Sequence, residues 1–319
     1  MRNFIQDYMV STQYFAPRGK ERLLFLGEQI SHRHINFNDL LIGVVGDAGA
    51  GKSSLIKGMF PGLQLSNDDD IVNPRKMMQV RNTFQEVDDA TTFHIDVRFQ
   101  MAFTQMYEIV EYVQLLLEKK RRVVIVHLHL IYPAVGRNAD LVVGIGEEII
   151  LARPSLFGPQ PTSIYKIVHD SLRYRKMAHS AEEVVVSILN KTFNIPEDDY
   201  YFSEIRNGFV IKFMKKPVID LDKLAELIDL QIAQNLEISY YDENHIIMGD
   251  EIIECDGPRF HINNTSEIEH FSLVREIMYD PYSKTFCLIG LVDDGGGDIF
   301  NRNTEYFLTR KGIDLESGY

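Results

Sequence analysis

Cysteine is nearly absent from this chain of 319 residues, which contains only Cys255 and Cys287. Two cysteines are too few for a disulfide framework, so each is expected to be a thiol or a metal ligand. Long hydrophobic runs are absent as well, and no apolar stretch approaches the roughly 20 residues that a membrane-spanning helix needs. The first 22 residues lack the apolar segment of a signal peptide. These absences predict a cytoplasmic protein without a membrane partner.

Positive charge is also scarce, since 33 Lys and Arg residues stand against 46 Asp and Glu residues and leave a formal net charge of -13. An excess of negative charge opposes non-specific binding to nucleic acid, which depends on counterion release at basic side chains. Any RNA contact therefore needs a local basic patch. Two short clusters are either candidates for such contact or simply solvated faces: Arg173, Arg175 and Lys176, and Lys212, Lys215 and Lys216.

A glycine-rich segment carries the strongest functional signal. DLLIGVVGDAGAGKSSLIKGMF, residues 39–60, reads as an apolar strand, a turn and a helix, and its centre matches G-x-x-x-x-G-K-[ST] at every fixed position. In this pattern backbone N–H groups and the start of the helix surround the phosphates. The lysine reaches the β and γ phosphates and the hydroxyl ligates magnesium. The sequence therefore predicts bound ATP with Mg²⁺. The predicted contacts are Gly46, Asp47, Ala48, Gly49, Ala50, Gly51, Lys52, Ser53 and Ser54, with Lys52 also catalytic and Ser53 on magnesium.

Alternating elements surround this segment. Residues 16–34 read as a helix that covers a sheet, in an N-terminal helical extension of residues 1–35, and residues 101–120 have helical apolar spacing. Further strands are predicted at 92–99, 121–132, 139–146 and 148–154. This order after a phosphate-binding loop predicts a three-layer α/β NTPase domain, residues 36–176, with a mostly parallel sheet and the nucleotide at the carboxyl ends of its strands. Arg153 and Pro154 are expected to border the adenine.

Phosphoryl chemistry also needs an acidic group to hold magnesium or to orient the attacking oxygen. The strand at 121–132 has His127 and His129 where Asp or Glu is usual. Alternation along a strand would put both histidines on one face, where they either line the nucleotide cleft or lie in the interior. Asp96 is the predicted substitute, because its strand is expected to lie next to the phosphate-binding loop.

A second acidic cluster consists of Asp68, Asp69 and Asp70, which follow a short predicted strand. Many small-molecule kinases place a catalytic base at such a position. The cluster is therefore either catalytic or a solvated turn.

Two segments of this half resemble a known family. GDAGAGKS followed by HIDVRF resembles the bacterial ATPase that assists the threonylcarbamoyladenosine modification of tRNA, whose pattern is a G-D-x-G-A-G-K-[ST] loop and then an H-x-D-x-Y-R strand. The resemblance covers about a hundred residues and implies ATP hydrolysis.

The order of predicted elements changes after Pro154. Helices come first and short strands follow, which predicts a separate α+β domain, residues 177–319. Four of its segments resemble, in order, the editing domain of alanyl-tRNA synthetase and its free-standing relatives. HSAEEVVVSIL resembles the helix H-T-A-T-H-L-L-x-x-A-L, GFVIKF resembles R-x-R-F-D-F, DLDKLAELIDLQIAQNLEI resembles the helix ending in N-x-x-I-x-x-N-x-x-V, and HINNTSEI resembles H-V-x-x-T-G-E-I. The whole chain resembles a bacterial P-loop family that carries this domain.

The resemblance implies a zinc site beside the ester of a mischarged tRNA. In that family two histidines spaced H-x-x-x-H and a pair spaced C-x-x-x-H hold the ion. Here His179 takes the first place, Glu183 stands where the second histidine would be, and Cys255 and His261 stand for the last pair. Positions i and i+4 share a helix face, and zinc accepts nitrogen, sulfur and oxygen ligands. The alternative is an exposed His179–Glu183 pair and a buried Cys255 that acts as a small hydrophobic residue.

Together these signals predict an ATP-binding protein, a magnesium-dependent ATPase, coupled to a domain that holds an aminoacylated tRNA or an amino-acid-like small molecule. Two alternatives stay open. One is a small-molecule kinase in which Asp68, Asp69 or Asp70 is the base. The other is a non-catalytic binding module controlled by nucleotide.

Overall fold

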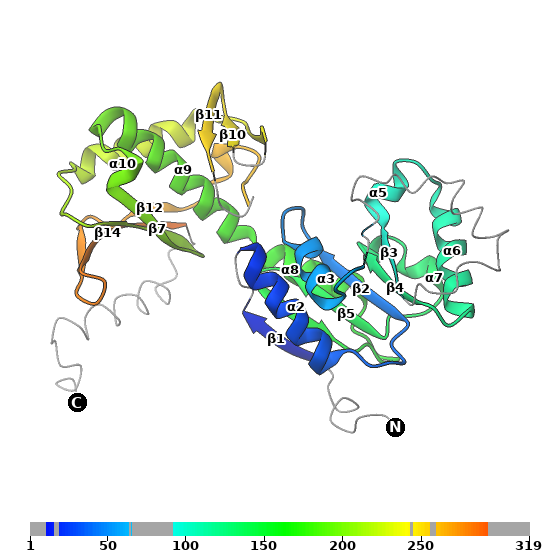
Figure 1. The fold of residues 1–319 in the computed structure, drawn as a ribbon. Helices are drawn as coiled ribbons and strands as arrows, with labels where there is room; N and C mark the ends of the chain where they lie inside the picture. The colour runs from blue at the N-terminus through cyan, green and yellow to red at the C-terminus, as the bar shows by residue number, and fades with distance from the viewer. Residues whose placement is uncertain are drawn as a thin grey trace. The chain divides into compact units, whose positions relative to one another are not determined.

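The computed structural model describes residues 11–15, 19–63, 65, 92–242, 245–255 and 260–292. The chain divides into two compact units, residues 1–171 and 172–319, and Figure 1 labels many of their helices and strands. The predicted acidic cluster Asp68, Asp69 and Asp70 lies outside the described residues, whereas the other predicted site residues lie within them.

The first unit is built on a six-stranded mixed sheet in the order β1-β6-β5-β2-β4-β3. Four neighbouring strands, β5, β2, β4 and β3, run parallel, and β6 and β1 add antiparallel at one edge (Figure 1). The sheet is therefore mostly parallel, as predicted. Its strands are β1 (Ser11–Phe15), β2 (Leu41–Gly46), β3 (Thr92–Asp96), β4 (Arg122–Val126), β5 (Leu141–Ile145) and β6 (Glu148–Ala152).

Helices cover this sheet on both faces, since all six residues of β2 are buried. On one face, side chains of α6 and α8 share a core cluster with Leu41 and Val45 of β2. The described helical segments of the unit are α2 (Lys20–His34), α3 (Lys52–Met59), α5 (Val97–Met101), α6 (Met106–Glu118), η1 (Leu128–Leu130), α7 (Tyr132–Val135) and α8 (Pro161–Ser171).

Two predicted strands are shorter than the apolar runs suggested. The strand from residue 92 ends at Asp96, whose side chain accepts the Phe99 N–H and begins α5. The strand from residue 122 ends at Val126, and His127 takes a left-handed conformation before η1. The prediction that His127 and His129 alternate along a strand was therefore wrong.

Two further expectations for this unit also differ from the structure. Asp96 had been expected on the strand next to β2, which leads into the glycine-rich loop. Instead, β4 lies between β2 and β3, the strand that ends at Asp96. The N-terminal segment contributes not only the helix α2 but also the edge strand β1, which no apolar pattern had indicated.

In its described residues, the second unit combines two α-helices with two antiparallel sheets. One sheet has the order β12-β14-β8-β7, with β13 also paired to β14, and the other has the order β11-β10-β9. α9 packs against β8, β14 and α10, and it is buried continuously from Met177 to Leu189. The elements are α9 (Arg173–Phe193), η2 (Glu197–Asp199), β7 (Tyr200–Ile205), β8 (Gly208–Phe213), α10 (Leu221–Ala233), β9 (Ile238–Tyr240), β10 (His245–Met248), β11 (Glu251–Glu254), η3 (Thr265–Glu267), β12 (Phe271–Leu273), β13 (Met278–Asp280) and β14 (Thr285–Val292).

The described helices contain no segment that is long and apolar enough to cross a membrane. The helices that were predicted to follow Pro154 are α8, in the first unit, and α9, in the second.

Candidate functional site

The glycine-rich segment forms the turn between β2 and α3, at the carboxyl edge of the parallel strands. Gly49 and Gly51 have φ angles of 75° and 85°, a left-handed region that glycine adopts without steric cost. α3 begins at Lys52, directly after Gly51. The arrangement is strand, turn and helix, which is the structural context that the sequence motif requires.

Lys52 turns back toward its own loop. Its Nζ atom donates to the carbonyl oxygens of Gly46 at 3.2 Å and Asp47 at 2.5 Å. Burial lowers the pKa of Lys52 to about 8, and the nearby Arg98 acts in the same direction, whereas the carboxylate of Asp96 opposes it. Asp96 therefore lies within electrostatic reach of Lys52, although β4 lies between β3, which ends at Asp96, and β2, which leads into the loop before Lys52.

Asp47, the residue after Gly46, contacts a cluster of ring side chains that consists of His129, Tyr165 and His169. The Asp47 carboxylate lies 2.8 Å from Nδ1 of His169 and accepts a hydrogen bond from the Tyr165 hydroxyl at 3.4 Å. The Tyr165 ring stacks on His129, with centroids 3.9 Å apart and planes 5° from parallel. Sequence reasoning missed Tyr165 and His169, although their i, i+4 spacing puts them on one face of α8.

His127 and His129 lie at the end of β4, beside this loop. They are 4% and 9% exposed, and their rings meet edge to face at 5.7 Å. Burial lowers the pKa of His127 to about 3 and that of His129 to about 4, and the positive charges of Lys52 and Arg98 act in the same direction. Both imidazoles are therefore neutral near pH 7.

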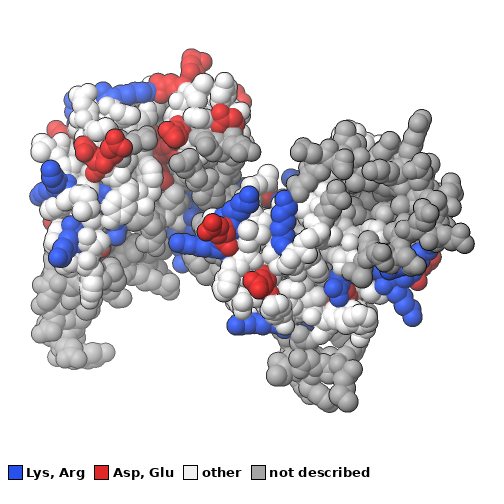
Figure 2. Space-filling view, in the orientation of Figure 1, with Lys and Arg blue, Asp and Glu red and all other residues white. Residues whose placement is uncertain are grey.

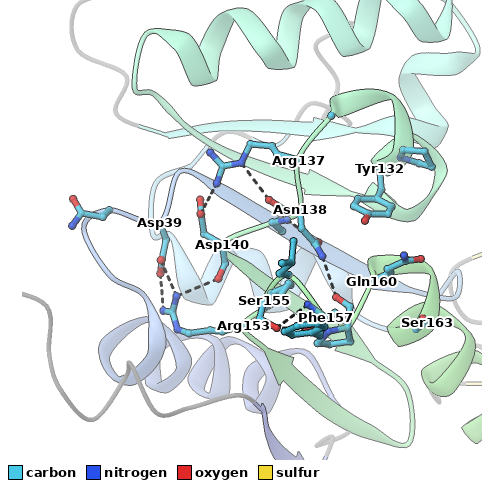
Figure 3. A pocket seen from close by; sticks show the side chains of 18 of the residues that line it. Asp39, Tyr132, Arg137, Asn138, Asp140, Arg153, Ser155, Phe157, Gln160 and Ser163 are labelled. Carbon is cyan, nitrogen blue, oxygen red and sulfur yellow. Dashed lines mark hydrogen bonds and ion pairs between the residues drawn. The ribbon is translucent and has the colours of Figure 1, made fainter.

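Arg153 and Pro154 lie near the amino-terminal ends of the parallel strands, whereas the glycine-rich loop lies at their carboxyl ends. The expectation that they border the adenine is therefore not met. β6 runs antiparallel to β5, and its carboxyl end lies where β2 and β5 begin. There Arg153 donates to both carboxylate oxygens of Asp39, at 2.9 and 2.8 Å, and to the Asp140 carbonyl (Figure 3). Arg153 lines a pocket, but its charge is already used to tie β6 to the segment before β2.

The second unit brings together His179, Glu183, Cys255 and His261. One ligand atom from each lies within 4.8 Å of the other three, and all four side chains are buried. Cys255 Sγ is 3.7 Å from Nε2 of His179 and 3.4 Å from Nε2 of His261. Nε2 of His179 is also 3.6 Å from the Glu183 carboxylate. The alternative in which His179 and Glu183 form an exposed pair was therefore wrong.

This donor set suits Zn²⁺. Two imidazole nitrogens, one thiolate and one carboxylate are ordinary ligands of a tetrahedral zinc ion. His261 holds its other ring nitrogen 3.3 Å from the Ser180 hydroxyl, and such outer contacts orient the imidazole in metal sites. Burial lowers the pKa of His179 to about 4 and that of His261 to about 2, so both offer a lone pair. Among the described residues, no other group of three or more His, Cys, Asp or Glu side chains lies as close together.

Glu182 lies beside this cluster and had not been singled out from the sequence. It is only 2% exposed, and burial raises its pKa to about 9, with the neighbouring Glu183 acting in the same direction. A carboxyl group in this place is neutral at pH 7.

The basic residues considered for RNA contact are partly engaged within the second unit. Arg173 pairs with Glu269 at 2.5 Å, Lys212 pairs with Asp280 at 3.4 Å, and Arg175 is buried. On the face seen in Figure 2, basic and acidic side chains of the described residues are interspersed in each unit. This distribution agrees with the negative net charge and favours no extended RNA-binding surface there.

The structure thus defines a protein of two units, one an α/β unit with a mixed, mostly parallel sheet and the other a unit with separate antiparallel sheets. No protein-family model and no curated protein matches the chain.

Proposed function

We propose that this chain is an ATP-binding protein of the P-loop class that hydrolyses ATP with a divalent cation. The observation that carries the proposal is the Gly46–Ser53 segment, which links a buried central strand to α3. Its turn lies at the carboxyl edge of the parallel strands, where open α/β sheets bind their ligands. The proximity of Asp96 to Lys52 adds a carboxylate at the same edge.

Each residue of the loop has a distinct task in this proposal. Lys52 exchanges the carbonyl oxygens of Gly46 and Asp47 for the β and γ phosphates, which are stronger acceptors. The Ser53 hydroxyl ligates the cation, and Asp96 orients the attacking water. When bound, the cation neutralises charge that develops on the phosphate oxygens. The sequence predicts that this ion is magnesium.

Two alternative functions are proposed for the same glycine-rich loop. A small-molecule kinase would use Asp68, Asp69 or Asp70 as its base. A non-catalytic module controlled by nucleotide is favoured by one observation, which is that His127 and not a carboxylate follows β4.

ATP affinity and turnover of the wild type, Lys52→Ala and Asp96→Asn test the proposal. We expect Lys52→Ala to weaken ATP binding about tenfold or more, since it removes a charge-assisted contact worth roughly 1.5–3 kcal/mol. Asp96→Asn should keep binding within a few-fold and lower kcat about a hundredfold, because it removes a group that acts in the transition state. Lys57→Ala, an exposed change on the same helix, is the control.

Three results would change this conclusion. Wild-type turnover no faster than that of Lys52→Ala, with ATP still bound, would leave only the nucleotide-controlled module. Transfer of the γ-phosphate to a metabolite would favour the kinase. No binding of ATP at all would exclude every form of the proposal.

We also propose that the second unit binds zinc, for which the cluster of His179, Glu183, Cys255 and His261 is the supporting observation. The resemblance to the alanyl-tRNA synthetase editing domain suggests an aminoacylated tRNA or an amino-acid-like ligand for this unit. Zinc, when bound, would polarise a carbonyl group of such a ligand. Four protein ligands close a tetrahedral site, so ester hydrolysis requires one of them to leave the ion.

Metal analysis of protein purified without a metal-binding tag tests the zinc site. We expect about one zinc per chain in the wild type and a near-complete loss in Cys255→Ala combined with His261→Ala, since zinc sites need their full ligand set. Cys287→Ala removes the other buried cysteine, which lies outside the cluster, and should leave the zinc in place. Zinc that is absent from the wild type, or retained by the double variant, would contradict the proposal. A stoichiometric result would make hydrolysis of mischarged aminoacyl-tRNA the next assay.

A further inference from the structure

His127 occupies a specific position relative to the glycine-rich loop. β4 pairs directly with β2, so the residue after β4 stands beside the carboxyl end of the loop strand. In P-loop proteins a carboxylate from the Walker B strand holds the magnesium ion of the nucleotide. In this chain the corresponding residue of the neighbouring strand is a histidine.

The backbone holds His127 firmly in this place. Its N–H donates to the Val44 carbonyl at 2.8 Å, which continues the β2–β4 ladder by one more bond. Its φ of 62° and ψ of 35° are left-handed, and among non-glycine residues mainly Asn, Asp and His tolerate this conformation. Left-handed non-glycine residues are concentrated at functional sites, where the surrounding structure maintains them.

The imidazole of His127 has an unused coordination position. Its Nδ1 atom is buried and has no hydrogen-bond partner among the described residues, and the same holds for Nδ1 of His129. A buried polar atom without a partner costs roughly 1–3 kcal/mol, so such an atom in a native protein points to a missing ligand. The charged groups that face the ring are Lys52 on α3, Arg98 on α5 and Asp47 in the loop.

The nucleotide would supply what this position lacks. The described side chains at this edge form no complete metal site by themselves, so an ion here takes most of its ligands from phosphate oxygens and water. The phosphates also offset the charges of Lys52 and Arg98, which disfavour a cation next to His127 in the free protein. An ion that arrives with the nucleotide therefore meets a neutral imidazole with an available lone pair.

We propose that His127 ligates the divalent ion of the bound nucleotide, and that the site selects a first-row transition ion such as Mn²⁺ or Co²⁺ over Mg²⁺. The inference rests on the proposed binding of ATP and replaces the magnesium that the sequence predicts. Magnesium takes oxygen ligands almost exclusively, whereas imidazole is a common ligand of transition ions. His129, fixed by its stack on Tyr165, packs edge to face against His127 and limits rotation of the ligating ring.

Affinity for a non-hydrolysable ATP analogue, measured with Mg²⁺, Mn²⁺ or Co²⁺ in turn, tests this inference without relying on turnover. We expect the wild type to bind the analogue about tenfold more tightly with Mn²⁺ or Co²⁺ than with Mg²⁺, which corresponds to roughly 1.4 kcal/mol. His127→Asp should shift the preference toward Mg²⁺ by a similar factor. Asp tolerates the left-handed backbone, so this variant is expected to fold. His32→Asp, at an exposed histidine of α2, is the matched control.

Electron spin echo spectroscopy of the Mn²⁺ and analogue complex provides a direct second measurement. The wild type should show modulation from a nitrogen bound to manganese, and His127→Asn, also compatible with a left-handed backbone, should lose it. Equal ion preferences in the wild type and His127→Asp, or no nitrogen coupling in the wild type, would overturn the inference while the nucleotide site stands. Failure to bind the analogue with any ion would instead remove the proposed function together with the inference.

Discussion

Lys52 shows how a single side chain connects folding to ligand binding. Its side chain is partly buried at the start of α3, and this burial is the main reason why its pKa is lowered from 10.5 to about 8. Because the pKa is lower in the folded chain than in an unfolded one, the charged lysine disfavours folding below about pH 8. That cost is relieved as the pH rises from 8 to 10.5, where the unfolded chain binds more protons.

Nucleotide affinity should show the opposite dependence on pH. Lys52 contacts phosphate as a cation, so affinity is expected to be constant up to about pH 8 and to fall roughly tenfold by pH 9, as the protonated fraction decreases. Titration of ATP by calorimetry from pH 7 to pH 9.5 checks this. Lys52→Arg stays charged over the whole range and serves as the comparison. A wild-type affinity that does not change up to pH 9.5 would exclude Lys52 as a phosphate ligand.

At the scale of elements, two glycines allow α2 and α3 to pack with their backbones in contact. A Cβ atom on Gly27 would lie 2.3 Å from the Leu55 carbonyl oxygen, and one on Gly58 would lie 2.1 Å from the Leu24 carbonyl oxygen. Neither space can be opened by rotating a side chain, because the obstructing atoms are backbone. α2 thereby fixes the position of the helix that carries Lys52 and Ser53.

Gly58→Ala is therefore expected to destabilise the protein although alanine favours helices. Overpacking of this kind costs about 1–3 kcal/mol, which exceeds the gain of up to about 1 kcal/mol in helix propensity. Urea unfolding measures the change, and nucleotide affinity should decrease as well because α3 has to shift. Lys57→Ala, an exposed position one residue earlier, receives the same residue without the backbone obstruction. A Gly58→Ala variant as stable as Lys57→Ala would mean that the two helices are not packed this closely.

At the scale of the whole molecule, each unit assembles its candidate site from distant parts of the chain. In the first unit, Lys52, Asp96 and His127 come from three separate elements that meet at one edge of the sheet. In the second, His179 and Glu183 of α9 meet Cys255 and His261, which follow more than 70 positions later in the sequence. The described residues named for each candidate site all belong to a single unit.

Much of the architecture could be predicted because the relevant signals are local. Most helices have a continuous apolar face, and most strands of the first unit are uninterrupted apolar runs. Local patterns failed where two different elements share one apolar run. Residues 123–132 are apolar apart from His127 and His129, yet the strand stops at Val126. Leu128 then fills the space above Gly43, where a Cβ atom would approach its side chain to 2.5 Å.

The sequence by itself determined the glycine-rich turn and its flanking strand and helix, because a turn with left-handed glycines depends on neighbouring residues only. It also indicated all four potential zinc ligands, though only through a resemblance. The tertiary structure alone decided that β4 separates Asp96 from the loop strand and that His127 faces Lys52. It likewise decided that Tyr165 and His169 hold Asp47 and that the four ligands converge in a buried cluster. These are distances between separate elements, and they follow from strand order and helix packing, which no single segment specifies.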